Sequence, residues 1–473
     1  MPIFDTIMKQ ILTYLLVLTT LVFFSCRKDS FITSPDAQLG IGVDTLHFDT
    51  VFTTTGSVTQ FFKITNNNNQ KLRLNSVSLK GGSASAFKIN VDGSMGPQLS
   101  NIEMDANDSI YVFVSVTINP NMANLPFVIR DSIEISYNGN NRLVQLEAWG
   151  QNANFLRSRI ITGNTVWTNT LPYVILGSLQ IDANATLTIP KGTKIYMHAD
   201  APILVDGTLK VTGEKDDSSR VYFSSDRRDY PYNEYPGSWP GIYFRGGAKD
   251  NVLQYAVVRN AYQGLVSELP SVNANPKLTL NECIVDNAYD AGIYGVQTSI
   301  TARNCLVSNC GKGVVLALGG NYQFTHCTMA AVSNNYIAHK DPSLYVSNYV
   351  VQGSTVLTSN LSAAFKNCIA WGANGIVDDE VVVDKQGSTG FGVSFDNCLW
   401  KVKNSPANAT ANNIIANQDP QFDSVDVQKR IFNFRLKGSS PGINKGINAG
   451  VAIDLDGNPR PVGLPDIGSY EKQ

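Results

Sequence analysis

Five charged residues between positions 259 and 303 have side chains from which a catalytic cleft can be built: Arg259, Glu282, Asp286, Asp290 and Arg303. Cleavage of a glycosidic bond by hydrolysis needs two carboxylates flanking that bond. Alternation along a strand would place Glu282 and Asp286 on one outward face. The chain has four His, so few imidazole groups are present that could act as a catalytic acid or base. The same charges could form surface ion pairs, and the sequence leaves catalysis open.

A second group of residues has the chemistry of a binding site. A stretch from Asp226 to Ser238, with the Trp that follows it, is rich in aromatic and basic side chains. Aromatic rings stack on sugars, and guanidinium groups pair with acids. We therefore predict a binding site for a glycan or a protein, with the alternative that these rings pack over the flank of the domain; the residues are Arg227, Arg228, Tyr230, Tyr232, Tyr235 and Trp239.

A repeat must position both groups. Cysteines recur after short β-branched runs, with spacings of 22, 22, 41 and 30 residues, at Cys283, Cys305, Cys327, Cys368 and Cys398. A period of this length with Asn and Gly at its bends is typical of a solenoid. Amphipathic stretches of helical length and regularly spaced Leu are both missing from this region. A parallel β-helix is the solenoid that remains, with coils about 4.8 Å apart.

The repeated Cys and Asn are predicted to be structural. Stacked side chains about 4.8 Å apart do not fit a disulfide, and a line of thiols lacks the tetrahedral arrangement of a zinc site. We expect the cysteines to be small buried hydrophobes. Asn260, Asn287 and Asn309 fall at sharp bends, where Asn tolerates the left-handed conformation, and their amides are expected to stack as a ladder.

The N-terminus has the pattern of an export signal. Residues 1–26 contain a basic start and an apolar run that ends at Ser25-Cys26. The segment Leu21 to Cys26 resembles a lipoprotein signal, which implies that a lipid on Cys26 ties the chain to a membrane. Residues 27–40 are predicted to be a linker. The expected location is the outer membrane, facing the periplasm or the cell surface.

Residues 41–152 show short alternating strands separated by Asn- and Gly-rich turns. Six or seven strands in this length predict a β-sandwich. The pattern resembles the immunoglobulin-like modules that precede larger domains in bacterial envelope proteins. Its expected role is spacing or docking.

Four short sequence motifs after residue 152 also resemble those of bacterial envelope proteins. These motifs resemble those of right-handed parallel β-helix proteins; they are Leu187 to Thr193, Asp206 to Leu209, Phe223 to Asp226 and Trp239 to Ile242. This domain is predicted over residues 160–436. Enzymes of this fold include polysaccharide lyases, which use an Arg or Lys base beside calcium-binding acids, and glycosidases. The chain has no Gly-His-Gly motif of the polygalacturonase type.

Residues 437–473 resemble the C-terminal segment named choice-of-anchor Q. We expect this segment to cap the solenoid, with Phe434 and Leu436 in a final coil and Arg460 paired to Asp466 or Glu471. The run from Asp454 to Asn458 has some likeness to a calcium loop, but its spacing is not that of an EF-hand. Calcium is left open there, and no other cofactor is expected.

Composition completes the prediction. The 37 basic and 39 acidic residues give a net charge of −2, so no electrostatic case exists for nucleic acid. We predict an all-β chain, with an immunoglobulin-like β-sandwich followed by a right-handed parallel β-helix. The predicted function is a monomeric, lipid-anchored, non-catalytic surface module that binds a glycan or an envelope or host protein. The alternative is a polysaccharide lyase or glycoside hydrolase acting on one face of the helix.

Overall fold

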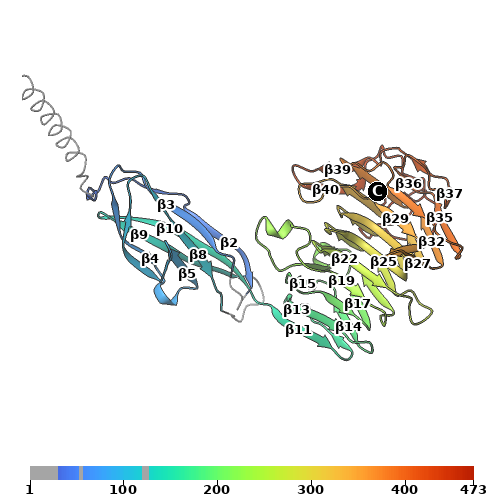
Figure 1. Ribbon diagram of the computed structural model, residues 1–473, viewed down its shortest axis with the longest axis horizontal. Coiled ribbons are helices and arrows are strands. Elements are labelled where there is room, and N and C mark those ends of the chain that lie inside the picture. The colour runs from blue at the N-terminus through green and yellow to red at the C-terminus, as the bar shows by residue number, and fades with distance from the viewer. Residues whose placement is uncertain (1–29, 53–56, 120–126) are drawn as a thin grey trace, which may run out of the picture. The chain divides into compact units, whose positions relative to one another are not determined.

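The computed structural model describes residues 30–52, 57–119 and 127–473, which divide into two compact units between Asn152 and Ala153 (Figure 1). The described residues are organised almost wholly as strands, with three 3-10 turns at Gly82–Ala84, Asp217–Ser219 and Tyr232–Glu234. None of them forms a helix with the length and hydropathy that crossing a bilayer requires. The predicted signal and the predicted lipidation of Cys26 fall outside the described residues.

The first unit is a β-sandwich of two five-stranded sheets, ordered β1-β3-β8-β5-β6 and β2-β10-β9-β4-β7. Pairing is antiparallel except between β10 and β2, which run parallel. Alternation sends every second residue inward, as in β8, where Ile110, Val112, Val114 and Val116 are buried. Its strands are β1 Leu39–Ile41, β2 Thr45–Phe52, β3 Gln60–Asn66, β4 Leu72–Leu79, β5 Phe87–Val91, β6 Ser94–Met95, β7 Gln98–Met104, β8 Ser109–Val116, β9 Phe127–Tyr137 and β10 Asn140–Gln151.

The second unit is a parallel β-helix, as predicted. Its 26 strands pair in parallel between successive coils and form three long sheets, which we call A, B and C. In Figure 1 the coils follow one another from β11 to β37. The first strand begins at Asn154 rather than at 160, and the last coil strand is β38, so the coils end well before 436.

Each coil passes through the three sheets in turn, and long strands bend from one sheet into the next. The strands that contribute to sheet A are β11 Asn154–Ile161, β13 Tyr173–Ile181, β15 Lys194–Met197, β18 Val221–Ser225, β21 Ala256–Arg259, β24 Ile284–Asp286, β26 Leu306–Ser308, β28 Thr328–Val332, β33 Ile369–Ala373, β36 Leu399–Trp400 and β38 Ile415–Ala416.

Sheet B continues from β11 and β13 through β16 Ile203–Val205, β19 Ile242–Phe244, β22 Gln263–Glu268, β25 Ala291–Arg303, β27 Lys312–Thr325, β29 Leu344–Ser347 and β34 Val381–Asp384. Sheet C contains the second halves of β25 and β27, with β12 Thr165–Val166, β14 Thr186–Pro190, β17 Thr208–Thr212, β20 Asn251–Gln254, β23 Leu278–Asn281, β32 Leu361–Lys366, β35 Phe391–Asp396 and β37 Thr410–Asn412. Two hairpins lie outside the coils: β30 Tyr349–Gln352 with β31 Thr355–Thr358, and β39 Phe422–Asp426 with β40 Ile431–Leu436.

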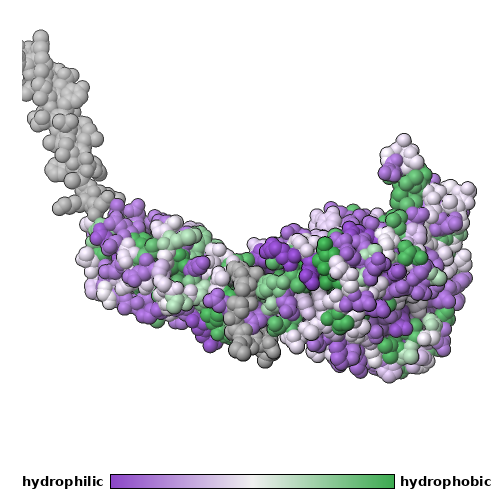
Figure 2. Space-filling view, turned by 90° about the horizontal axis from the view of Figure 1, so that it is seen from below, coloured by the Kyte–Doolittle hydropathy of each residue, from purple (hydrophilic) through white to green (hydrophobic). Residues whose placement is uncertain are grey.

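The interior of the solenoid is one continuous apolar core that includes the five repeated cysteines. All five thiols are free and buried at equivalent positions, just before the sheet A strands of successive coils. Burial raises the pKa of Cys283, Cys305, Cys327 and Cys368 well above the usual value. On the face of this unit seen in Figure 2, hydrophobic residues are scattered among hydrophilic ones without one broad apolar area.

The C-terminal segment does not complete another coil, which corrects the expected position of Phe434 and Leu436. Both residues lie in the antiparallel hairpin β39–β40. The hairpin and the residues after it pack on the outer face of sheet A, where Phe434 and Tyr470 contact Leu306 and Ala330. Further along the sheet, Leu436 and Ile467 pack with Ile369 and Leu399. The segment therefore covers a flank of the solenoid and not its end.

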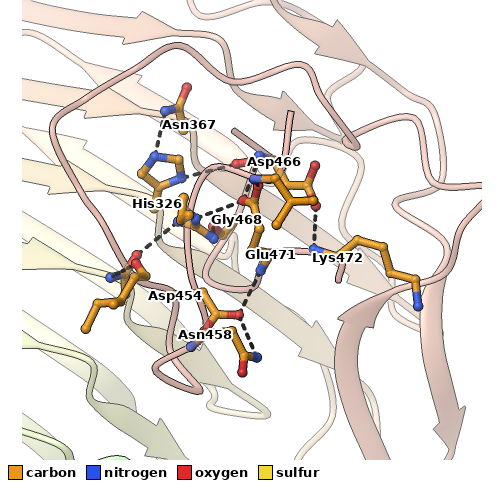
Figure 3. Close-up of polar contacts among 12 residues, drawn as sticks. His326, Asn367, Asp454, Asn458, Asp466, Gly468, Glu471 and Lys472 are labelled. Atoms are coloured by element: carbon orange, nitrogen blue, oxygen red, sulfur yellow. Dashed lines mark hydrogen bonds and ion pairs between the residues drawn. The ribbon is translucent and has the colours of Figure 1, made fainter. Parts of the chain in front are cut away.

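A row of polar residues holds this segment in place. Each residue before a cysteine of the row has a positive φ: Glu282, Asn304, His326, Asn367 and Asn397. The side chains of His326 and Asn367 extend toward the C-terminal segment (Figure 3). Asn304 donates to the Ile453 carbonyl at 2.8 Å, and Asn367 donates to the Ile447 carbonyl at 2.7 Å.

At the centre of this contact, Arg460 pairs with Glu471 at 3.0 Å, and both side chains are fully buried. Arg460 also donates to Asn304 Oδ1 at 3.0 Å. The pairing of Arg460 with Glu471 follows the sequence expectation, although it lies on the flank of the solenoid.

Candidate functional site

A groove follows the outer face of sheet A over its N-terminal coils. Its floor is made of outward side chains that stack in register: Lys194 lies opposite Tyr222, Tyr196 opposite Ser224, and Arg259 opposite Asp286. Two hollows of about 890 and 430 Å³ run along it and share Arg259, Asn260 and Tyr470. Strand alternation alone makes these side chains face outward.

The loop between β18 and β19 forms one wall of the groove. Asn260 Nδ2 donates to the Asn233 carbonyl at 2.7 Å, and Asn287 Nδ2 donates to the Glu234 carbonyl at 2.8 Å. Asn287 also donates to Asn260 Oδ1 at 2.8 Å. These two residues have φ values of 61° and 59°. Their stacked amides therefore join the loop to the bends of the solenoid.

Asn309 has a φ of 52° but bonds differently, donating to Asp286 Oδ1 at 3.1 Å. The amide stack therefore involves two of the three predicted asparagines.

The opposite wall is made by the C-terminal segment and by the turn before β18. Arg435 and Tyr470 line both hollows, and Lys215, Asp217 and Asp456 line the larger one. Arg430, in the turn of the β39–β40 hairpin, forms an ion pair with Glu234 of the loop. The two walls are thus connected above the smaller hollow, since Arg430 and Glu234 both line it.

Of the predicted aromatic binding residues, the three tyrosines are exposed and the tryptophan is buried. Tyr230 is 68% exposed, and the Arg430 guanidinium lies 5.5 Å from the centre of its ring. Tyr232 and Tyr235 are also exposed, with ring centres 5.2 Å apart. Trp239 is only 1% exposed and donates from Nε1 to the Arg259 carbonyl at 2.8 Å. Trp239 is therefore a core residue, which corrects its place in the predicted binding set.

The two arginines of the loop face different partners. Arg227 pairs with Asp229 through Nε and Nη2 at 2.8 and 2.9 Å, and its guanidinium lies 3.9 Å from the centre of the Tyr232 ring. Arg228 lies over the Tyr196 ring at 4.8 Å and lines the larger hollow. Of the two, Arg228 is the one positioned for a ligand in the groove.

The five catalytic candidates do not form one cleft. Arg259 and Asp286 are together in the groove, with Arg259 Nε 3.5 Å from Asp286 Oδ2. Asp286 Oδ1 also accepts from Ser308 Oγ at 2.7 Å.

The other three candidates lie outside the groove lining. Arg303 pairs with Glu282 at 3.1 Å, and Asp290 pairs with Lys312 at 2.8 Å. Burial opposes a low pKa for Asp290, but its hydrogen bonds from Lys312 and Gln263 outweigh burial and lower it. Glu282 is fully buried rather than outward, because its positive φ at the bend interrupts strand alternation.

The charges of the groove favour an anionic ligand. Its lining contains seven basic and four acidic side chains, whereas the whole chain has a net charge of −2. The acidic groups are occupied: Asp217 accepts from the Tyr222 hydroxyl, Glu234 pairs with Arg430, and Asp456 pairs with Arg435 at 2.7 Å. Burial and Asp217 raise the pKa of Tyr222 to about 12, so its hydroxyl stays protonated at neutral pH.

Several groove residues were missed at the level of sequence: Lys194, Tyr196, Lys215, Arg220, Tyr222, Arg435 and Tyr470. The strand residues among them had a usable signal. They occupy the outward positions of the strands that precede Arg259 in the same stack, so the period would have led to them. The contribution of Arg435 and Tyr470 depends on the path of the C-terminal segment, for which the repeat has no signal.

The possible calcium loop is satisfied by its own chain. Asp454 Oδ1 accepts from the backbone of Asp456 and Asn458 at 3.0 and 2.8 Å, and Oδ2 accepts from the backbone of Glu471 at 3.0 Å (Figure 3). Across the part of the chain that the structure describes, no group of three or more His, Cys, Asp and Glu side chains is arranged to hold a metal ion.

No family model matches the chain, and no curated protein matches it. A solved structure similar over most of the chain is the catalytic unit of the thermostable GH87 alpha-1,3-glucanase from Streptomyces thermodiastaticus, with 9% identity, 76% of this chain and 89% of that chain covered, and a TM-score of 0.20.

Two other solved structures match shorter parts. A family 123 glycoside hydrolase from Clostridium perfringens is similar over 28% of this chain and 31% of its own, with 14% identity and a TM-score of 0.21. PapD-like domain 7 of human CEP192 is similar over 26% of this chain and 89% of its own, with 12% identity and a TM-score of 0.18. The chain thus spans about a third of the family 123 enzyme. Similarities this distant assign no activity to this chain.

Proposed function

We propose that the chain is a non-catalytic glycan-binding module whose site is the groove on the outer face of sheet A. The observation that carries the proposal is the lining of this groove. Tyrosine rings and cations face an open hollow of about 890 Å³, whereas its carboxylates are held by neighbouring side chains. Aromatic faces with a few polar groups are the usual lining of sugar sites, and hydrolysis would need two available carboxylates.

The proposal extends to attachment. A lipid on Cys26 would tie this module to the outer membrane, and the β-sandwich would act as a spacer between the membrane and the groove. Labelling with a radioactive fatty acid tests this part. Label should enter the wild-type chain and be absent from Cys26→Ala; equal labelling of both chains would exclude the anchor.

A panel of neutral and acidic oligosaccharides tests binding, measured by calorimetry on the full chain. Tyr222→Ala should weaken the best ligand at least tenfold, since stacking on an aromatic face is lost. Tyr294→Ala is the matched control, because Tyr294 is a half-exposed tyrosine of β25 that does not line the groove. Failure of every saccharide to bind at millimolar concentration, or equal losses in the two variants, would overturn the proposal.

One observation favours the enzyme alternative: Arg259 and Asp286 approach within 3.5 Å in the groove. A lyase would leave unsaturated ends and a hydrolase new reducing ends on any saccharide that binds. Product formation that Arg259→Ala abolishes would replace the binding module with an enzyme. Binding without new chain ends supports the module.

A further inference from the structure

Four cations that line the larger hollow have no carboxylate partner among the described residues. They are Lys194, Lys215, Arg220 and Arg228. Lys194 and Lys215 are exposed, Arg228 is half-exposed, and Arg220 is buried at the edge of the floor. Like charges gathered in one hollow repel one another, and that repulsion is relieved when an anion enters.

The environment of Arg220 also indicates that an anion binds in the larger hollow. Its side chain is 6% exposed, and its guanidinium lies 5.1 Å from the centre of the Tyr255 ring. Nη2 donates to the Leu455 carbonyl at 2.9 Å, whereas Nη1 has no hydrogen-bond partner in the described part of the chain. A buried cation without a counter-charge is costly. An anion held in the hollow beside Arg220 would supply the missing negative charge.

Among the described residues no carboxylate forms an ion pair with Arg220; the buried Asp454, which acts on the same Tyr255 and Tyr470 rings, already accepts three backbone hydrogen bonds. Burial raises the pKa of Tyr255 to about 12, so this ring is neutral at physiological pH. Asp217 accepts from the Tyr222 hydroxyl, and Asp456 is held by two hydrogen bonds from Arg435. The uncompensated positive charge therefore remains with the hollow.

The spacing of the groove favours a polymer over a single small anion. Lys194, Tyr222 and Val257 lie opposite one another on three successive coils, and coils are about 4.8 Å apart. This rise is close to the length of one pyranose unit in an extended chain. A polysaccharide that follows the stack would therefore place about one sugar over each coil, with its acidic groups near the cations of the floor and the two walls.

We infer that the groove selects an acidic polysaccharide, a polymer whose sugars carry carboxylate or sulfate groups. This inference rests on the proposed glycan-binding function and adds the class of ligand. Lys194 and Lys215 are selectivity residues in this arrangement, since they are exposed and their substitution leaves the apolar core intact.

The test compares Lys194→Gln/Lys215→Gln with a matched control, Lys210→Gln/Lys366→Gln, whose lysines are exposed on the strands of sheet C and do not line the groove. The probes are oligogalacturonate, sulfated dextran and neutral dextran of similar length, titrated calorimetrically against the full chain. The groove variant should lose roughly tenfold in affinity for the acidic probe, as expected for two exposed ion pairs, and the control should lose less than about twofold. Raising NaCl from about 0.05 to about 0.5 M should weaken wild-type binding strongly and the groove variant less.

The possible outcomes distinguish the preference for acidic sugars from glycan binding itself. Preference for oligogalacturonate identifies a carboxylate ligand, and preference for sulfated dextran identifies a sulfate ligand; either supports the inference when the groove variant loses it. Binding of neutral dextran that resists both salt and the lysine substitutions overturns the acidic class and leaves the glycan proposal standing. Absence of binding to all three probes overturns both. Equal losses in the groove variant and the control assign the effect to overall charge and overturn the site.

Discussion

His326 should make the solenoid sensitive to acid, because the folded chain holds this imidazole uncharged. The side chain is 1% exposed. Nδ1 donates to the Asp466 carbonyl at 3.1 Å, and Nε2 accepts from Asn367 Nδ2 at 2.9 Å (Figure 3). Burial, and then the charge of Arg460, lower the pKa of His326 to about 3. Protonation would turn the Nε2 acceptor into a donor facing another donor.

The sign and size of the effect follow from linkage. The pKa of an unfolded histidine is about 6.5, so between about pH 6.5 and pH 3 the unfolded chain binds a proton that the folded chain does not. Stability from this residue is fully present above about pH 6.5 and decreases as the pH falls. Between pH 7 and pH 4.5 the loss amounts to about 2.5 kcal/mol, at about 1.4 kcal/mol per pH unit below 6.5.

The assay is urea unfolding at these two pH values, followed by tryptophan fluorescence. Four of the five tryptophans lie in the solenoid unit: Trp167, Trp239, Trp371 and Trp400. The substitution is His326→Asn, which places at this bend the residue that the neighbouring coils have at Asn304 and Asn367. At pH 7 the variant should be less stable by about 1–2 kcal/mol, since the imidazole hydrogen bonds are lost. At pH 4.5 the difference should close or reverse.

Neighbouring titrations are common to both proteins and cancel in the difference. The charged groups around the imidazole are Arg460, Asp454, Asp466 and Glu471. Burial raises the pKa of Asp466, which acts in the opposite sense to His326. His198→Asn, which removes a half-exposed imidazole from the same unit, should keep the acid sensitivity of the wild type. A stability gap between wild type and His326→Asn that is the same at both pH values would refute the reasoning.

Three further predictions concern the buried polar groups of the solenoid. Lys277 is fully buried and donates from Nζ to the Arg245, Gly246 and Glu268 carbonyls at 3.1, 3.1 and 2.6 Å. Lys277→Met should therefore lower the free energy of unfolding by about 2–4 kcal/mol, measured in urea. Lys210→Met, at an exposed lysine, should change it by less than about 0.5 kcal/mol. Arg460→Leu leaves the Glu471 carboxylate buried without its partner, and should lower the free energy of unfolding by about 3–5 kcal/mol. It should also increase hydrogen exchange over residues 440–473, and unchanged exchange there would contradict the role of this ion pair. The cysteines of the row should resist a thiol reagent in the folded chain and react together on unfolding, and rapid labelling of several thiols in the native protein would contradict their burial.

The repeat could be predicted because its signal is local. Each coil repeats the same need for a bend, a buried small residue and alternating apolar positions, so Cys305 and Val307 repeat what Cys283 and Val285 do. The same logic failed at Glu282. Alternation was continued through a residue with a φ of 53°, where the chain leaves one strand direction for another. The residues before the cysteines were therefore missed as a row, although Asn, Glu and His recur there in register.

The candidate site was only partly predictable because one wall comes from a distant part of the chain. The aromatic and basic loop from 226 to 238 was found from composition, and it does line the groove through Arg228, Asn233 and Glu234. The contacts of Arg435 and Tyr470 with this groove join segments about two hundred residues apart in sequence. No period connects such segments, so neither their side of the solenoid nor their partners could be inferred.

The outer face of sheet A explains why the groove is where it is. Along one line of the stack its outward residues change from Lys194 and Tyr222 in the first coils, through Val257 and Ile284, to Leu306, Ile369 and Leu399 in the later ones. Exposed apolar side chains are costly in water, so the C-terminal segment covers the later coils, where it contributes its own apolar residues. The first coils carry the charged and tyrosine side chains of the groove and are left open. The position of the groove therefore follows from where the sheet becomes apolar, and substituting Leu399 with Lys should loosen the segment at its distal end, seen as faster hydrogen exchange around residue 443.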